Sequence, residues 1–251
     1  MAAPTNAVPL AIPKSPHPSK PKSKIWIVEF YSSAVGKKWV MGLTGIMMIG
    51  FVLMHMIGNL KVYLGAGDFN HYAEFLRHLL VPILPRTVAL WLLRFGLIGA
   101  VFFHIHSAIG LTKMNKRSRP QQYATPRDYV AANFASRTTR WTGTIIALYV
   151  LFHLLDLTWG VGKKSDQFVR GDAYHNLVHS LSRPGVAIVY IVCNIAVAIH
   201  LYHGTWSMFQ SLGWNNPRFN AWRRAIASGV AGLIGVGNVV FPIMILTKVV
   251  K

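Results

Sequence analysis

Long apolar stretches alternate with short polar ones along most of this chain. Five apolar stretches are long enough to cross the hydrocarbon core of a bilayer, which is roughly 30 Å thick and needs about 20 helical residues. They lie near residues 40–64, 88–112, 142–162, 185–210 and 226–248. They lack the apolar–polar alternation of barrel strands, and lipid offers backbone groups no other hydrogen-bonding partner. The pattern therefore predicts an all-α polytopic membrane protein with a bundle of five transmembrane helices.

Composition and the N-terminal segment agree with this class. Of 251 residues, 53% are apolar and only 13% are charged, which is unlike a water-soluble domain of this size. Residues 1–36 are expected to form a flexible basic cytoplasmic tail with an interfacial segment, and residues 37–251 the transmembrane domain. Residues 1–24 have no apolar core that would indicate a cleavable signal peptide. The single cysteine, Cys193, falls inside the fourth span, so no internal disulfide is expected.

Basic residues are distributed unequally between the two sides of the predicted bundle. Sixteen lie in the N-terminal segment and the second and fourth loops, nine lie on the opposite side, and Arg94 falls inside the second span. The positive-inside rule therefore predicts a cytoplasmic N-terminus and an outside C-terminus. The net charge of +19 suits anionic membrane lipid or an acidic partner. Nucleic acid is not expected as a partner, because the basic runs contain no interleaved aromatic residues.

Six of the eleven histidines lie inside predicted spans: His55, His104, His106, His153, His200 and His203. One recurs in each of the first four spans, at positions 55, 104, 153 and 200. Ionisable residues inside a membrane are costly and usually functional. Because successive helices run in opposite directions, His55 and His153 should lie toward the outside, and His104 and His200 toward the cytoplasm. The sequence thus predicts two pairs of histidines at two depths.

Each pair suits bis-histidine ligation of haem, in which imidazoles from facing helices take both axial positions of one iron. A single membrane histidine is more often an interhelical hydrogen-bonding group, but four matched positions favour ligands. Zinc and copper sites need three or four converging ligands, and the i,i+2 pair His104 and His106 points about 200° apart. A Rieske-type centre would need two cysteines, although an unusual iron site with Cys193 stays open. Several small residues would allow close approach of helices or a macrocycle: Gly42, Gly45, Gly50, Gly96, Gly99 and Gly143.

Several local motifs follow one another between residues 37 and 217. They read "KKWVMGLTGIMMIGFVLMHMIGNL", "LRFGLIGAVFFHIHSAIGLTKMNKRSRPQQY", "SRTTRWTGTIIALYVLFHLLDLTWG", "AYHNLVHSLSRP" and "HLYHGTWSMFQSLGWNNPR". The most specific is H-x-x-H-G-x-W-S followed by Q-S-L-G. In this order they resemble the membrane-anchor subunit of succinate dehydrogenase and fumarate reductase, of the single-polypeptide, five-helix cytochrome b class.

The resemblance implies two b-type haems and their ligands. His104 and His200 would hold the haem nearer the cytoplasm, and His55 and His153 the outer one. His106 stays open as an alternative to His104, which is preferred for its more regular spacing. The resemblance also places a histidine beside the ligand at His203, as a propionate partner or a packing residue. Arg94 is a candidate partner for an outer-haem propionate, or else a snorkelling arginine.

The implied function is electron conduction in respiratory complex II. Electrons from succinate would pass from a flavoprotein subunit to an iron–sulfur subunit docked on the basic cytoplasmic face, and then through this chain to menaquinone or another quinone. The chain would perform no carbon chemistry itself. Two alternatives are a cytochrome b anchor of another quinone-linked dehydrogenase and a non-redox transporter whose histidines relay protons. Asp156 is read as a proton relay, a hydrogen-bond acceptor or a water-exposed carboxylate at a helix end.

Overall fold

The computed structural model describes residues 25–118, 134–214, 216, 218 and 220–250, which contain helices and no strand. Residues 1–24 of the expected tail lie outside this part of the chain. Five helices are long and apolar enough to span a membrane: α2 (Ala34–Asn59), α4 (Val88–Arg117), α5 (Phe134–His153), α7 (Pro184–Ser211) and α8 (Asn220–Leu246). The prediction of an all-α bundle with five spans is confirmed.

Local signals, rather than the limits of the apolar runs, determine where the long helices begin and end. Helix α2 begins six residues earlier than predicted, because the Ser33 hydroxyl caps it by accepting the Gly36 N–H at 2.9 Å. Helix α4 continues to Arg117, since cationic side chains are favourable at a helix C-terminus. A 3₁₀ turn, η1 (Leu60–Leu64), follows α2, and a π-helical turn, η2 (Leu154–Thr158), follows α5. Such π turns often accompany functional sites.

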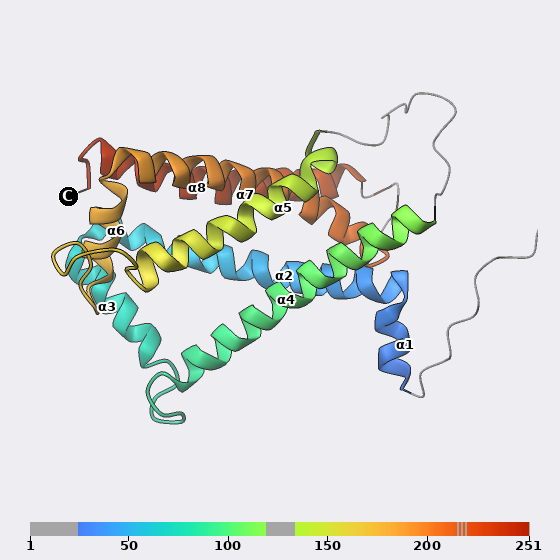
Figure 1. Ribbon diagram of the computed structural model, residues 1–251, viewed down its shortest axis with the longest axis horizontal. Coiled ribbons are helices and arrows are strands. Elements are labelled where there is room, and N and C mark those ends of the chain that lie inside the picture. Colours follow the sequence, from blue (N-terminus) through green and yellow to red (C-terminus); the bar gives the residue numbers. More distant parts are fainter. Residues whose placement is uncertain (1–24, 119–133, 215, 217, 219, 251) are drawn as a thin grey trace, which may run out of the picture.

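Three shorter helices lie at the two ends of the bundle (Figure 1). Helix α1 (Trp26–Ser32) runs crosswise at one end, while α3 (Ala66–Arg77) and α6 (Ala173–Leu181) lie at the other. The Asp172 carboxylate caps α6 by accepting the His175 N–H at 2.9 Å and also accepts the Asn70 side-chain amide of α3 at 2.9 Å. Two of the loops that the sequence places outside therefore contain helices, α3 and α6, and the Asp172 carboxylate links them.

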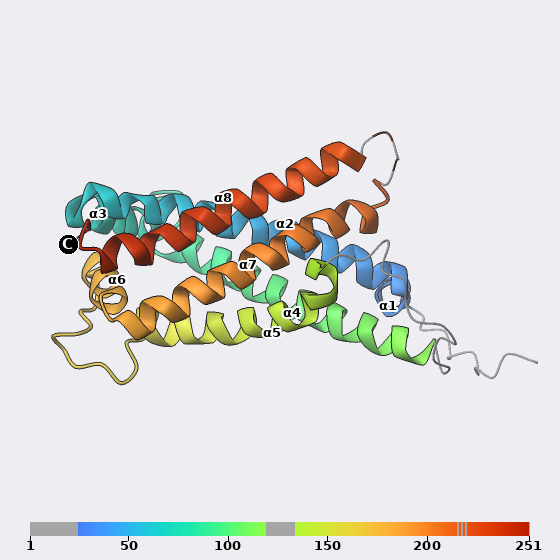
Figure 2. The same ribbon diagram turned by 90° about the horizontal axis from the view of Figure 1, so that it is seen from above.

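The two central helices of the bundle are α2 and α7, which contact each other (Figures 1 and 2). Helix α2 also packs against α4, and α7 also packs against α5 and α8. The apolar core is most continuous at the end that carries α3 and α6, where it consists of Met56, Val62, Phe69, Leu177, Leu181, Tyr190, Phe241, Ile245 and Val250. This arrangement places α2 and α5, which carry His55 and His153, directly beside α7, which carries His200.

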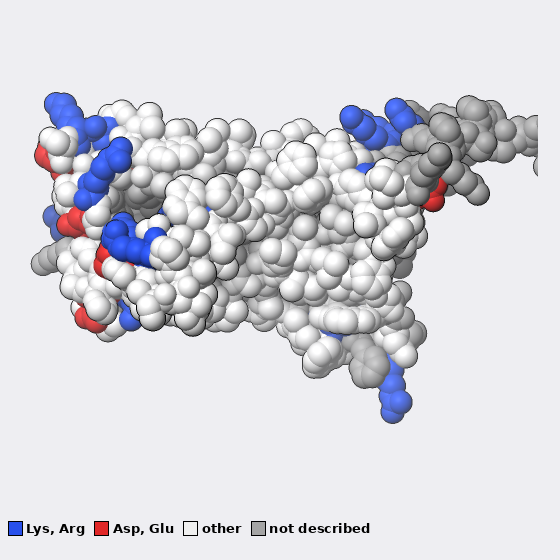
Figure 3. All heavy atoms as spheres, turned by 90° about the horizontal axis from the view of Figure 1, so that it is seen from below, with Lys and Arg blue, Asp and Glu red and all other residues white. Residues whose placement is uncertain are grey.

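The lateral surface of the bundle is apolar. Large side chains such as Leu92, Phe95 and Phe102 on α4 are each at least 60% exposed. Figure 3 shows lysine, arginine and acidic side chains gathered at the two ends and a broad uncharged region between them. Apolar area of this kind is unfavourable in water, at about 25 cal/mol per Å², but suits lipid. These features are those of a membrane protein. The orientation of its termini stays a prediction from the distribution of charge.

Candidate functional site

Four histidines from four different helices meet in two pairs. His104 of α4 and His200 of α7 have ring centres 6.4 Å apart, with ring planes at 61°. His55 of α2 and His153 of α5 have ring centres 5.9 Å apart, with planes at 89°. This is the pairing that the spacing and the helix directions predicted.

The two pairs lie at different depths in the bundle. Thr44 of α2 contacts His104, and His55 follows Thr44 by eleven residues on the same helix. Eleven residues of α-helix advance by roughly 16 Å. On α5, Thr142 contacts His200 and His153 again follows by eleven residues. The His55–His153 pair is therefore displaced along the bundle toward α3 and α6.

The separation within each pair fits one metal ion between two imidazoles. An imidazole–metal bond is about 2.0 Å long and the bonded nitrogen lies about 1.1 Å from the ring centre, so two imidazoles on opposite sides of one metal ion would have ring centres about 6.2 Å apart. The observed values of 5.9 and 6.4 Å bracket this distance. Bis-histidine ligation also leaves the two ring planes free to rotate relative to each other, so the angles of 89° and 61° are compatible with it.

The second ring nitrogen is already engaged in three of the four histidines. His104 Nδ1 lies 3.3 Å from Thr44 Oγ1 and 3.2 Å from the Met41 carbonyl oxygen. His200 Nδ1 lies 3.2 Å from Thr142 Oγ1, and His153 Nδ1 lies 3.4 Å from the Tyr190 hydroxyl. Metal-bound histidines usually hydrogen-bond through the nitrogen that does not hold the metal. The donor set therefore fits haem iron held through the Nε2 atoms.

Glycines and an exposed histidine ring lie beside the two pairs. The His55 ring stacks on Phe51 with ring centres 5.4 Å apart, and its side chain is exposed. A Cβ atom added at Gly45 would lie 3.8 Å from the His104 ring, and one at Gly143 would lie 3.5 Å from the His200 ring. These two glycines let neighbouring helices approach the rings. Cβ atoms at Gly50, Gly96 and Gly99 would meet open space, so close helix contact does not explain these three.

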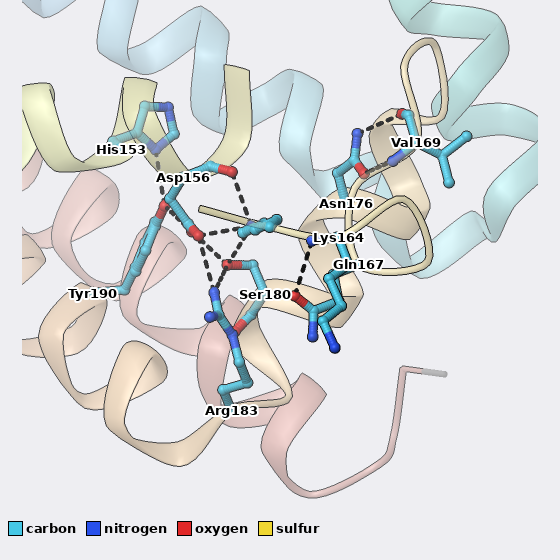
Figure 4. Close-up of polar contacts among 10 residues, drawn as sticks. His153, Asp156, Lys164, Gln167, Val169, Asn176, Ser180, Arg183 and Tyr190 are labelled. Carbon is cyan, nitrogen blue, oxygen red and sulfur yellow. Dashed lines mark hydrogen bonds and ion pairs between the residues drawn. The ribbon is translucent and has the colours of Figure 1, made fainter. Parts of the chain in front are cut away.

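A buried ion-pair network adjoins the His153 ring (Figure 4). The Tyr190 hydroxyl donates to Asp156 Oδ2 at 3.2 Å, on the other side from His153. Asp156 is buried, and Lys163 Nζ and Arg183 lie 2.7 and 2.9 Å from its Oδ1. The Ser180 hydroxyl also donates to it. The reading of Asp156 as a water-exposed carboxylate is therefore wrong, because folding of the 159–172 loop brings Lys163 back over it.

The remaining predicted residues are not members of either histidine pair. His106 points to Tyr31, with its Nδ1 in hydrogen-bond contact with the Tyr31 hydroxyl, and does not face His200. The half-buried His203 makes no hydrogen bond or ring contact within the described residues. The exposed Arg94 stacks on Trp91 at 4.8 Å, which favours the snorkelling interpretation. Cys193 is a half-buried free thiol.

Sequence reasoning missed the hydrogen-bonding partners of the ligands and misread one arginine. No sequence pattern marks Thr44, Thr142 or Tyr190 as the hydrogen-bonding partner of a particular histidine. Arg223 is one of the sixteen basic residues that the sequence places on the predicted cytoplasmic side, but it is 2% exposed and its guanidinium lies 4.7 Å from the Trp206 ring centre. It therefore offers no charge to a partner at the surface.

Other metal chemistries find less support among these side chains. In the described part of the chain, no three or more His, Cys, Asp or Glu side chains gather closely enough to share a metal ion. A zinc, copper or Rieske-type centre needs such a group, whereas haem needs only two protein ligands. Comparison of the chain with models of protein families, with curated proteins and with solved structures found no match.

Proposed function

We propose that this chain is the membrane-anchor cytochrome b subunit of a succinate:quinone oxidoreductase, with two b-type haems and a quinone as electron acceptor. The observation that carries the proposal is the meeting of four imidazoles, from four separate spans, in two facing pairs at two depths. The motif order between residues 37 and 217 supports the succinate dehydrogenase assignment.

In this function, bound haem supplies a one-electron carrier at each depth of the bundle. The four histidines hold it, and the helices that carry them are fixed by packing of α2 against α4 and α7 and of α5 against α7. The Nδ1 contacts orient the rings so that the Nε2 atoms are available as ligands. Apolar spans exclude water from both levels, which raises the influence of nearby hydrogen bonds and charges.

The partners would be a flavoprotein subunit and an iron–sulfur subunit that binds the end of the bundle carrying α1. The basic residues at this end whose side chains the structure describes are Lys37, Lys38, Lys113, Lys116, Arg117, Arg140, Arg218, Arg223 and Arg224. Lys37 and Arg223 are buried, so the exposed remainder would make the electrostatic contacts. Lipid and quinone would reach the chain from its apolar lateral surface.

A spectrum of the purified complex tests the proposal directly. We expect a b-type reduced-minus-oxidised spectrum, two haems per chain, and haem reduction on addition of succinate. A cytochrome b anchor of another dehydrogenase would contain haem but stay oxidised with succinate. A folded chain without a Soret band would overturn the proposal and favour the transporter alternative.

Replacing single ligands should remove one haem at a time. His104→Ala and His200→Ala should each lose the haem nearer α1, while His55→Ala and His153→Ala should each lose the other, as measured by haem content per chain. His106→Ala is the matched control, because it removes a membrane histidine on α4 two residues from His104 and should retain both haems. Retention of two haems in a folded His200→Ala variant would contradict the ligand assignment.

A further inference from the structure

The two histidines of the His104–His200 pair are held by the same arrangement on two different helices. On α2, the Thr44 hydroxyl and the Met41 carbonyl, three residues earlier, both contact His104 Nδ1. On α5, the Thr142 hydroxyl contacts His200 Nδ1, and the carbonyl of Thr139, again three residues earlier, also bonds this ring. Two helices thus repeat one contact set.

This repeat is visible in the sequence once the contacts are known. Residues 44–55 and 142–153 share the pattern T-G-x9-H. Each copy begins with the threonine and glycine that adjoin a histidine of one pair and ends with a histidine of the other pair. The glycine places each ring near the helix backbone, at 3.8 and 3.5 Å from the added Cβ positions. Helices α2 and α5 therefore each carry a histidine of one pair and contact a histidine of the other.

Each threonine hydroxyl is directed by its own helix. Thr44 donates to the Val40 carbonyl at 2.7 Å, and Thr142 donates to the Thr139 carbonyl at 3.0 Å. A hydroxyl that donates its only proton can serve another group only as an acceptor. The contacts therefore assign the proton to Nδ1 of His104 and His200, which leaves the Nε2 lone pairs of both rings free.

We propose that Thr44 and Thr142 are positioning residues that set the orientation and electron density of both ligands of one haem, an inference that rests on the proposed function. An acceptor on Nδ1–H makes an imidazole a more basic ligand. A more basic ligand stabilises ferric over ferrous iron and lowers the midpoint potential. The two threonines act only on the His104–His200 pair, because His153 is bonded by Tyr190 and His55 has no hydrogen-bonding partner among the described residues.

The test compares threonine, valine and serine at both positions. Valine has the shape of threonine without the hydroxyl, so Thr44→Val and Thr142→Val should each move one haem midpoint to a more positive potential and shift its low-spin ferric EPR signal. Haem affinity at that level should fall by roughly 10- to 100-fold. Thr44→Ser and Thr142→Ser should restore wild-type values. A purely steric role for the side chain would not be rescued by serine.

Thr144→Val is the matched control, because Thr144 lies on α5, is exposed, donates to the Arg140 carbonyl at 3.1 Å, and makes no hydrogen bond to any of the four paired histidines among the described residues. Performing the titrations in a His55→Ala background leaves one haem and identifies which potential moves. Unchanged potentials and EPR signals in folded, haem-containing Thr44→Val and Thr142→Val chains would overturn the positioning role of the two threonines while leaving the proposed function intact. A wild-type chain without haem would overturn both.

Discussion

The buried carboxylate of Asp156 should be a major determinant of stability at the end of the bundle that carries α3 and α6. Its side chain and that of Lys163 are each only 5% exposed, and their charged atoms lie 2.7 Å apart. The change Asp156→Asn preserves the shape of the side chain but removes its charge. Among the described residues, it leaves the buried Lys163 ammonium beside neutral oxygens, namely the residue 156 carbonyl at 2.8 Å and the Ser180 hydroxyl at 3.4 Å.

Removing one member of a buried ion pair costs about 3–5 kcal/mol, because the other charge stays desolvated. We expect the lower part of this range, about 3 kcal/mol, since neutral acceptors remain beside Lys163 and Arg183 is 45% exposed and can be solvated. For a chain of this length, 1 kcal/mol corresponds to about 2–4 °C, so the unfolding midpoint should fall by roughly 6–12 °C.

Thermal unfolding in lipid nanodiscs, followed by circular dichroism, measures this shift. The double variant Asp156→Asn with Lys163→Met should recover most of the loss, because it removes the unpaired charge. Glu74→Gln is the control: Glu74 lies at the same end, where Arg86 and Arg77 lower the pKa of its exposed carboxylate to about 2, and this solvated cluster should contribute little. An Asp156→Asn midpoint equal to that of the wild type, with no recovery in the double variant, would show that the pair is not desolvated.

Three further results are expected. Asp172→Ala should destabilise α6 by about 1 kcal/mol through loss of its cap, seen as faster amide hydrogen exchange within α6. The His175 N–H, followed by the Asn70 amide, lowers the pKa of Asp172 in the folded chain, so its contribution is present above about pH 4 and is lost as pH falls through the folded value. The increase in amide hydrogen exchange of α6 at acid pH should therefore disappear in Asp172→Asn. If that increase persisted, a group other than Asp172 would be responsible for it. Arg94→Ala should leave both haem potentials unchanged, because its guanidinium stacks on Trp91; a shifted potential would restore its role as a propionate partner.

The number of spanning helices and the presence of one histidine in each of four spans could be predicted from the sequence. Both are local properties: a span needs only a sufficient run of apolar residues, and residue spacing gives the depth of a side chain along a helix. Alternating helix direction then sorts the histidines into two levels. The same reasoning placed His55 with His153 and His104 with His200, as the structure does.

The choice between His104 and His106 depended on the rotation of α4 about its own axis. The sequence shows that the two rings point in different directions, but only packing of α4 against α2 decides which one meets His200. Likewise, the partners of Asp156 come from a loop and from α6 and α7, at separations of 7 to 34 residues, which no local pattern predicts.

The sequence by itself therefore determined the membrane class, the five spans and the depths of the histidines, because hydrophobic length and helical rise act within one segment. The tertiary structure decided which ring nitrogens are engaged, that Thr44 and Thr142 hold one pair, and that Asp156 and Arg223 are buried. These features depend on the relative rotation and contact of separate helices. The free energy that selects them comes from packing and from satisfying buried polar groups across the whole bundle.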